Sequence, residues 1–266
     1  MTGRVEGRTV LITGAGSGMG RAIAIAMARE KARVGVLDLR GDAAEATVAE
    51  IEAAGGSAVA FTGDVTRRSD VRRAVSGVVE AFGRLDVMFN VAGFNKPMRL
   101  LDVTEENWRA IMDVNGLGTL IGLQEAARQM IAQGGGGELS GKIINTTSIA
   151  GRQGYPSFAP YSASKFAVVA LTQAGARGLA QHGITVNAFG PGVVDTPLWT
   201  QLDKDLMEIG DSERPGQAME DFSAPILRGR PARPEDIVGT ALYLASGDSD
   251  YLTGQVVMID GGMVLV

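Results

Sequence analysis

Seven short apolar runs alternate with longer amphipathic stretches along most of the chain. The runs show almost no polar alternation, which is typical of strands that are covered on both faces of a parallel sheet. They occupy residues 8–13, 33–38, 57–61, 85–90, 142–147, 184–189 and 255–260. The amphipathic stretches have the period of helices and occupy residues 19–31, 42–54, 67–82, 104–113, 116–133, 161–182 and 234–245. This alternation predicts one doubly wound α/β domain over residues 1–266, with a seven-stranded parallel sheet and helices on both faces.

Residues 193–230 interrupt the alternation. The segment contains prolines and shows no strand pattern, so we expect a long loop after the sixth strand. Loops of that length inside a compact domain are usually functional lids or disordered. Ligands of open α/β sheets bind at the carboxyl ends of the strands, and the segment begins there. We therefore expect residues 193–230 to form a substrate lid.

Composition and charge exclude several classes of function. The 266 residues carry a formal net charge of −5, whereas a protein that binds a nucleic-acid backbone needs a basic face. The sequence has no cysteine and a single histidine, His182, so we expect no metal site and no thiol chemistry. It shows no leader pattern and no apolar run of 18 residues, so we expect a cytoplasmic protein with no membrane partner.

A glycine-rich turn follows the first apolar run and opens the first predicted helix. Residues 13–20 read Thr-Gly-Ala-Gly-Ser-Gly-Met-Gly. Glycine permits a tight turn and lets a pyrophosphate approach the backbone, while the helix N-terminus adds free N–H groups and partial positive charge. This context predicts a Rossmann-type dinucleotide site. The turn residues expected to bind the dinucleotide are Gly14, Ser17, Gly18, Met19 and Gly20.

Acidic residues at the ends of the second and third runs extend the predicted site. A carboxylate at Asp38 can accept hydrogen bonds from both adenosine ribose hydroxyls, and it repels a 2′-phosphate. The expected cofactor is therefore NAD rather than NADP. Asp64 is expected beside the adenine, although an aspartate that caps a turn fits its position nearly as well.

A predicted helix begins at Tyr161, and Lys165 follows four residues later. Residues at that spacing share one helix face. A cation ~4 Å from the phenol, at an effective dielectric constant of ~20, is worth about 4 kcal/mol and could lower a tyrosine pKa by up to about three units. We therefore expect Tyr161 to act as an acid/base near neutral pH. Ser148 follows the fifth run, at the edge of the sheet where ligands bind. Its hydroxyl is expected to hold the substrate oxygen.

Together these residues resemble the short-chain dehydrogenase/reductase family, and the match covers nearly the whole chain. The family's phosphate motif Thr-Gly-x-x-x-Gly-x-Gly is present at residues 13–20, and its Asn-Asn-Ala-Gly motif appears as Asn-Val-Ala-Gly at residues 90–93. The resemblance implies a catalytic tetrad of Asn115, Ser148, Tyr161 and Lys165, in which Asn115 orders a water that links Lys165 to solvent. It implies further dinucleotide contacts from Leu39, Val65, Asn90, Ala92, Gly93, Tyr161, Lys165, Pro191, Gly192, Val194 and Thr196.

Within that family, residues 193–199 and 248–255 are similar to acetoin and 2,3-butanediol dehydrogenases, and residues 127–133 and 142–145 to sorbitol-type enzymes. The resemblance implies an NAD-dependent oxidoreductase that interconverts a secondary alcohol and its ketone by hydride transfer, with Tyr161 as the general acid/base. The expected substrate is a small diol, polyol or hydroxyketone. The resemblance also implies a homotetramer built through the fourth and fifth helices and the last strand.

Two alternative functions stay open. One is a 3-oxoacyl carrier-protein reductase, an enzyme class that usually prefers NADPH and carries a basic residue where Ser17 or Leu39 stands here. The other is a dinucleotide-sensing protein without turnover, a class that typically lacks the tyrosine or the lysine of the tetrad.

Overall fold

Seven parallel strands form one sheet in the computed structural model, which describes residues 3–134 and 139–265. The strands lie in the order β3-β2-β1-β4-β5-β6-β7, so the chain crosses over once, between β3 and β4. Their bounds are β1 (Thr9–Thr13), β2 (Arg33–Asp38), β3 (Ser57–Thr62), β4 (Val87–Asn90), β5 (Gly141–Thr146), β6 (Ile184–Pro191) and β7 (Val256–Ile259). The predicted doubly wound sheet is confirmed. Ligand sites of such sheets lie where the order reverses, here outside β1 and β4.

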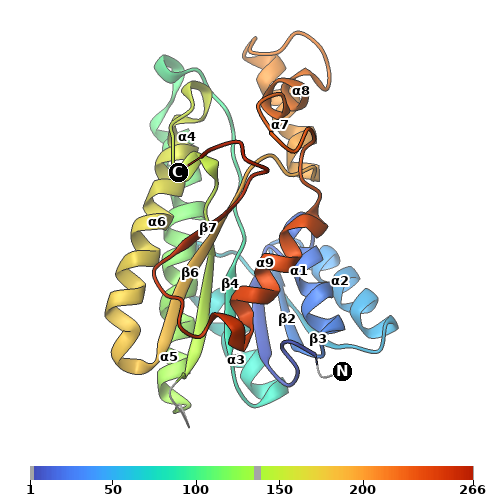
Figure 1. Ribbon diagram of the computed structural model, residues 1–266, viewed down its shortest axis with the longest axis vertical. Coiled ribbons are helices and arrows are strands. Elements are labelled where there is room, and N and C mark those ends of the chain that lie inside the picture. The colour runs from blue at the N-terminus through green and yellow to red at the C-terminus, as the bar shows by residue number, and fades with distance from the viewer. Residues whose placement is uncertain (1–2, 135–138, 266) are drawn as a thin grey trace.

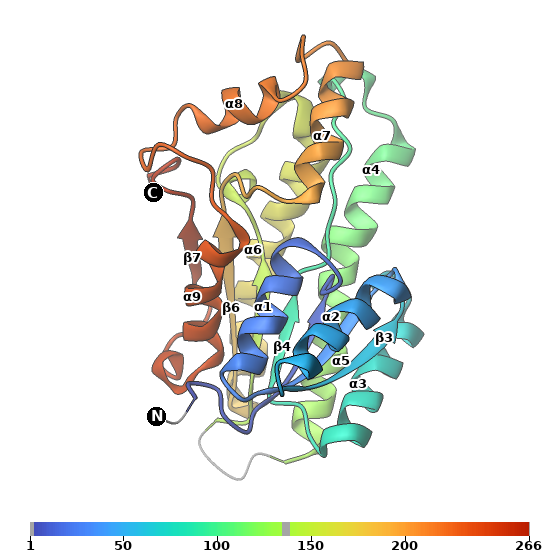
Figure 2. The same cartoon turned by 90° about the vertical axis from the view of Figure 1, so that its right-hand side faces the viewer.

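Helices cover both faces of the sheet, as Figures 1 and 2 show. On one face α1 (Gly18–Arg29), α2 (Gly41–Ala53) and α9 (Pro234–Ala245) pack through residues such as Ile23, Ile51 and Ile237. The other face carries α3 (Arg68–Phe82), α5 (Gly118–Ala132) and α6 (Ala159–Leu179), which share a second apolar core. A shorter helix, α4 (Glu105–Met112), lies against α6. The two cores hold the strand ends rigidly, so side chains that follow those ends are well positioned.

Residues 193–230 are not the long loop that the sequence predicts. They contain α7 (Pro197–Glu208) and α8 (Gln217–Ser223), which stand beyond the carboxyl ends of the strands in Figure 1. Pro197 occupies the first turn of α7, where its missing N–H costs no helical hydrogen bond. Leu202 and Leu206 lie one turn apart on α7, and both are buried. The prolines of this segment therefore do not prevent helix formation.

The helices predicted at residues 104–113 and 116–133 are continuous with each other. A π-helical turn, Asp113–Leu117, joins α4 to α5 and places Asn115 at its centre. Such turns insert one residue into a helix and often occur at functional sites. In this structure the turn directs the buried Asn115 side chain toward the loop that follows β4.

Candidate active site

Two adjoining pockets lie at the carboxyl ends of the strands. The larger, of about 460 Å³, is bounded by the glycine turn and the ends of β2 and β3. The smaller, of about 110 Å³, lies between the end of β5, the start of α6 and the helices α7 and α8. Met19, Gly93 and Thr196 line both pockets, so the two form a continuous groove.

The backbone of the glycine turn forms one wall of the larger pocket. Gly14 has a φ of +65°, and a Cβ there would come within 2.9 Å of the Ala92 Cα. A Cβ on Gly20 would lie only 2.2 Å from the Gly14 carbonyl oxygen. The Thr13 hydroxyl accepts hydrogen bonds from the N–H groups of Val91, at 3.0 Å, and Ala92, at 3.1 Å. The bare backbone at the start of α1 therefore fits a dinucleotide pyrophosphate.

The Asp38 carboxylate is buried at the end of β2 and held by two backbone donors. Its Oδ2 accepts from the Gly16 N–H at 2.9 Å, and its Oδ1 accepts from the Arg40 N–H at 3.0 Å. Leu39 lies between Asp38 and Arg40 in the chain, and its side chain is 67% exposed. Arg40 also lines the larger pocket, a residue that the predicted contacts omit. Both a carboxylate and a guanidinium can therefore reach a ligand at this end of the groove.

Asp64 lines the same pocket, but its carboxylate already has local partners. Its Oδ1 accepts from the Thr66 N–H at 2.9 Å and from the Thr66 hydroxyl at 2.7 Å. The alternative interpretation, an aspartate that caps a turn, therefore describes this side chain at least as well as an adenine contact does.

Most residues of the predicted dinucleotide site meet in this groove. Those that line the larger pocket are Gly14, Ser17, Gly18, Met19, Gly20, Asp38, Leu39, Asp64, Val65, Ala92, Gly93 and Thr196. Those that line the smaller one include Tyr161, Lys165, Pro191, Gly192 and Val194. Asn90 lines neither pocket, because its Nδ2 donates to Asn145 Oδ1 at 2.9 Å between β4 and β5. That side chain ties two strands together within the sheet.

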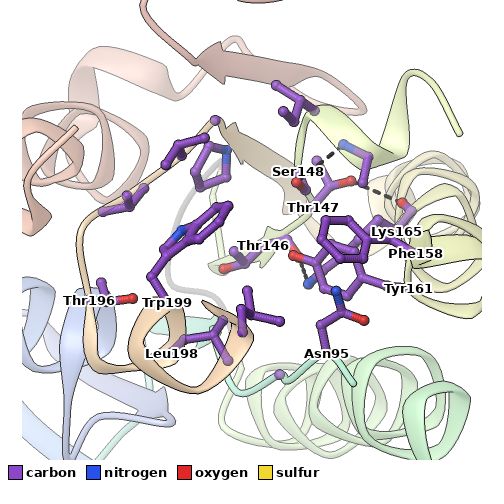
Figure 3. Close-up of a pocket in the computed structure, with 18 of the residues that line it drawn as sticks. Asn95, Thr146, Thr147, Ser148, Phe158, Tyr161, Lys165, Thr196, Leu198 and Trp199 are labelled. Atoms are coloured by element: carbon purple, nitrogen blue, oxygen red, sulfur yellow. Dashed lines mark hydrogen bonds between the residues drawn. The ribbon is translucent and has the colours of Figure 1, made fainter. Parts of the chain in front are cut away.

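Ser148, Tyr161 and Lys165 converge in the smaller pocket, as Figure 3 shows. Tyr161 and Lys165 come from the first turns of α6, and Ser148 follows β5. The Lys165 Nζ lies 5.4 Å from the centroid of the Tyr161 ring and donates to the Thr146 carbonyl oxygen at 3.0 Å. Ser148 also accepts from the Ala150 N–H at 3.2 Å, which shapes the turn after β5. The three side chains thus reach one small volume from two elements.

The expected lowering of the tyrosine pKa is not observed in this structure. Burial raises the pKa of the Tyr161 phenol, while the nearby Ser148 hydroxyl lowers it by less. Burial also lowers the pKa of the Lys165 ammonium to about 8. The ammonium lies over the ring face and donates to a carbonyl oxygen, so it has lost hydration without gaining an anionic partner among the described residues. The phenol is consequently a proton donor near neutral pH in this state.

Asn115 does not line the smaller pocket, but it holds the backbone of Phe94, which does. Its Oδ1 accepts from the Phe94 N–H at 3.0 Å, and its Nδ2 donates to the Phe94 carbonyl and to Ser164 Oγ, each at 3.0 Å. A Cβ on Gly93 would lie 2.9 Å from Asn115 Oδ1 and 3.5 Å from Lys165 Nζ. Asn115 thus lies close to Lys165, with its own side-chain amide engaged in shaping the loop after β4.

Aromatic side chains from the turn that precedes α6 and from the lid segment, residues 193–230, line the smaller pocket. The rings of Phe158 and Phe222 stack with centroids 5.4 Å apart, and Trp199 packs against Phe222 at 5.6 Å. Asn95 and Tyr155 also line this pocket, and neither was predicted from the sequence. No local pattern marks Asn95, because only the fold shows that its side chain is buried. An apolar chamber with a few polar groups suits a small oxygenated organic molecule.

Within residues 3–134 and 139–265, no cluster of histidine, aspartate and glutamate is arranged to hold a metal ion. No helix in that same part of the chain is long and apolar enough to cross a membrane.

Comparison with known proteins gives relatives over almost the whole length of the chain. A diacetyl reductase [(S)-acetoin forming] of Staphylococcus epidermidis is 40% identical over 97% of this chain and 98% of its own. An L-2,3-butanediol dehydrogenase of Corynebacterium glutamicum is 40% identical with the same coverage of the two chains. A sorbitol dehydrogenase of Cereibacter sphaeroides is 39% identical, again over 97% of this chain and 98% of its own.

Solved structures agree with these sequence relatives. A short-chain type dehydrogenase/reductase from Mycobacterium marinum superposes with a TM-score of 0.89, at 34% identity over 98% of this chain and 97% of that one. A Beutenbergia cavernae protein, provisionally named an NAD(P)-dependent gluconate 5-dehydrogenase, has a TM-score of 0.87 and 34% identity over 99% of both chains, and its structure contains NADP at low occupancy. The short-chain dehydrogenase family model matches residues 8–207. The chain therefore belongs to the short-chain dehydrogenase family and is an oxidoreductase that acts on CH–OH groups.

Proposed function

We propose that the protein interconverts a small vicinal diol, polyol or hydroxyketone with the corresponding ketone, using NAD(H), and that Tyr161 is the general acid/base. The observation that carries the proposal is the convergence of Ser148, Tyr161 and Lys165 in a small aromatic pocket that adjoins the glycine-turn pocket. A proton donor, a hydrogen-bonding hydroxyl and a dinucleotide cradle at one sheet edge are the parts that carbonyl reduction requires.

NAD(H), when bound, supplies or accepts the hydride, and the side chains of the chain manage the proton. The Tyr161 phenol donates its proton to the carbonyl oxygen during reduction, and the resulting phenolate accepts the proton of the alcohol during oxidation. Ser148 hydrogen-bonds the same oxygen, more strongly as negative charge develops on it. Lys165 places a cation over the Tyr161 ring, which stabilises the phenolate left after proton donation. Asn115 holds the loop that carries Gly93 beside Lys165.

The size and lining of the smaller pocket favour a compact substrate. Its volume of about 110 Å³ and its aromatic walls suit a short carbon chain with few polar groups. The names of the relatives agree, since they refer to diacetyl, butanediol and sorbitol. A carrier-linked 3-oxoacyl chain, the alternative that we considered, would need a longer apolar channel.

A substrate screen and one variant test the proposal together. Purified protein is assayed by NADH absorbance with vicinal diols, polyols, hydroxyketones and a 3-oxoacyl thioester. Tyr161→Phe should lower kcat by about 10²–10⁴-fold on the best substrate, because it removes the exchangeable proton and little volume. NADH affinity, measured by fluorescence, should stay near the wild-type value. A Tyr161→Phe variant that retains more than about a tenth of wild-type kcat would refute the assigned role.

We also propose a homotetramer assembled through α4, α5 and β7. Trp108, Leu117 and Ile131 are 43%, 42% and 41% exposed along the α4–α5 surface, and large apolar side chains in such positions often mark an interface. The strand β7 ends the sheet in the described chain, and its unpaired edge could meet a second copy. Light scattering of the purified protein should give four times the chain mass of 27.7 kDa.

A further inference from the structure

Asn95 carries a buried polar atom without a partner beside the candidate active site. It lies in the loop after β4, is 6% exposed, and lines the smaller pocket. Its Oδ1 has no hydrogen-bond partner anywhere in the described chain. In Figure 3 its side chain extends from that loop toward the region of Tyr161 and Lys165. A buried amide oxygen without a partner costs stability, so such a group in a pocket points to a ligand that completes the hydrogen bonds of the side chain.

The Asn95 side chain is not needed to shape its own loop. Asn115 binds both the N–H and the carbonyl of Phe94, the preceding residue. Asn107 donates from its Nδ2 to the carbonyl of Lys96, the following residue, at 3.0 Å. Two other amides therefore hold the backbone on either side of Asn95, which leaves its own amide available to the pocket.

We propose that the Asn95 amide binds the second oxygen of the substrate, on the carbon next to the reacting one. The inference rests on the proposed function, in which Tyr161 and Ser148 hold the reacting oxygen. An amide both donates and accepts, so it can pair with a neighbouring ketone or a neighbouring hydroxyl. Asn95 thereby selects vicinal diketones, hydroxyketones and diols over compounds with a single oxygen.

Two other polar groups in the pocket are rivals for this role and supply matched controls. The Tyr155 hydroxyl accepts from Gln153 Nε2 at 2.6 Å and keeps its own proton free to donate. The Thr146 hydroxyl oxygen is also buried without a partner in the described residues, and in Figure 3 it points toward the α7 side of the pocket, whereas Asn95 comes from the opposite side. Tyr155→Phe and Thr146→Val each delete one rival hydroxyl with little change in volume.

The experiment compares two ketones that differ by one hydroxyl group. With NADH as donor, kcat/KM is measured for 3-hydroxybutan-2-one and for butan-2-one on each protein. The ratio of the two values does not depend on the fraction of active enzyme, so a partly folded variant remains informative. Asn95→Leu, which is nearly isosteric, should lower the ratio at least tenfold, mainly by raising KM for the hydroxyketone. Asn95→Ser, which keeps a hydroxyl, should lower it less.

Three results would count against the inference, and they are distinguishable. If wild-type enzyme reduces both ketones and Asn95→Leu leaves the ratio unchanged, Asn95 does not bind the second oxygen. A tenfold fall in Tyr155→Phe or Thr146→Val, with no fall in Asn95→Leu, would assign the role to that rival. Wild-type enzyme that turns over neither ketone and none of the diols, polyols and hydroxyketones of the screen, with either dinucleotide, would reject the proposed function itself.

Discussion

Replacement of Asp38 should change the choice between NAD and NADP more than any other single substitution in the groove. The 2′-phosphate of NADP brings about two negative charges to the ribose end, where the Asp38 carboxylate lies. At 4 Å and an effective dielectric constant of ~20, each like-charge pair costs about 4 kcal/mol, and solvent at the open end of the pocket reduces this. We therefore expect NAD to exceed NADP in kcat/KM by about 10²-fold, or about 2.8 kcal/mol.

The carboxylate cannot easily move away from a 2′-phosphate. Its two oxygens accept from the N–H groups of Gly16 and Arg40, at 2.9 and 3.0 Å. Rotation would leave both donors unpaired, at about 1–3 kcal/mol each. Arg40 offers a compensating cation, but its side chain is exposed and its attraction is screened. The repulsion should therefore outweigh the attraction.

The assay is initial rates with both dinucleotides on one accepted ketone, at fixed ionic strength. Asp38→Ser should narrow the ratio of NAD to NADP at least tenfold, mainly through weaker NAD binding, since the ribose hydroxyls lose their acceptor. An added Leu39→Arg should raise NADP use, because this position is 67% exposed and accepts a cation without burial. Asp42→Ser removes a nearby carboxylate that does not line the groove, and it controls for long-range charge.

Equal or better use of NADP by the wild-type enzyme would refute this reasoning. It would mean that Arg40 governs the ribose end of the pocket. That outcome would also strengthen the 3-oxoacyl reductase alternative. It would agree with the NADP that is bound in the Beutenbergia cavernae structure.

Three further predictions concern the substrate oxygen, the buried lysine and the lid. Ser148→Ala should lower kcat/KM by about 10²-fold with NADH affinity unchanged; a variant that loses NADH binding but keeps its chemistry would contradict the role. Because burial lowers the pKa of Lys165 to about 8 from the ordinary 10.5, the folded state binds fewer protons than the unfolded state between those values, and stability rises with pH there. Lys165→Met should thus raise the free energy of unfolding of the ligand-free protein at pH 7 by about 1–3 kcal/mol, and this stabilisation should decrease above pH 8. Thermal melts measure the difference, and an unchanged melting temperature at pH 7 would show that the ammonium is not destabilising. Residues 193–230 should gain protection from hydrogen exchange when NAD and substrate are added, whereas equal protection in both states would indicate a rigid insert.

Local patterns in the sequence were sufficient for most of the fold. The central strands are runs that are buried on both faces, and the edge strands β3 and β7 are partly exposed. Each major helix repeats an apolar face every three or four residues, so both signals lie within a few neighbours. The glycine turn, Asp38, and the spacing of Tyr161 and Lys165 are equally local, and the structure places all of them along one groove. In α7 the prolines that suggested a loop misled the prediction, because Pro197 sits at the first turn, where a helix tolerates it.

Other properties depend on contacts between residues that are distant in the chain, and only the tertiary structure decided them. The Asn90 amide reaches Asn145 within the sheet, although its motif predicts a contact with the dinucleotide. Burial raises the pKa of Tyr161 by more than the hydrogen bond to Ser148 lowers it, and the energy of desolvation is set by every element packed around the ring. Asn95 is buried without a partner for Oδ1 in the described chain, since Asn107 and Asn115 hold the backbone on each side of it. Periodicity reports which face of an element is apolar, whereas burial, hydrogen-bond partners and pKa values depend on what that face meets after folding.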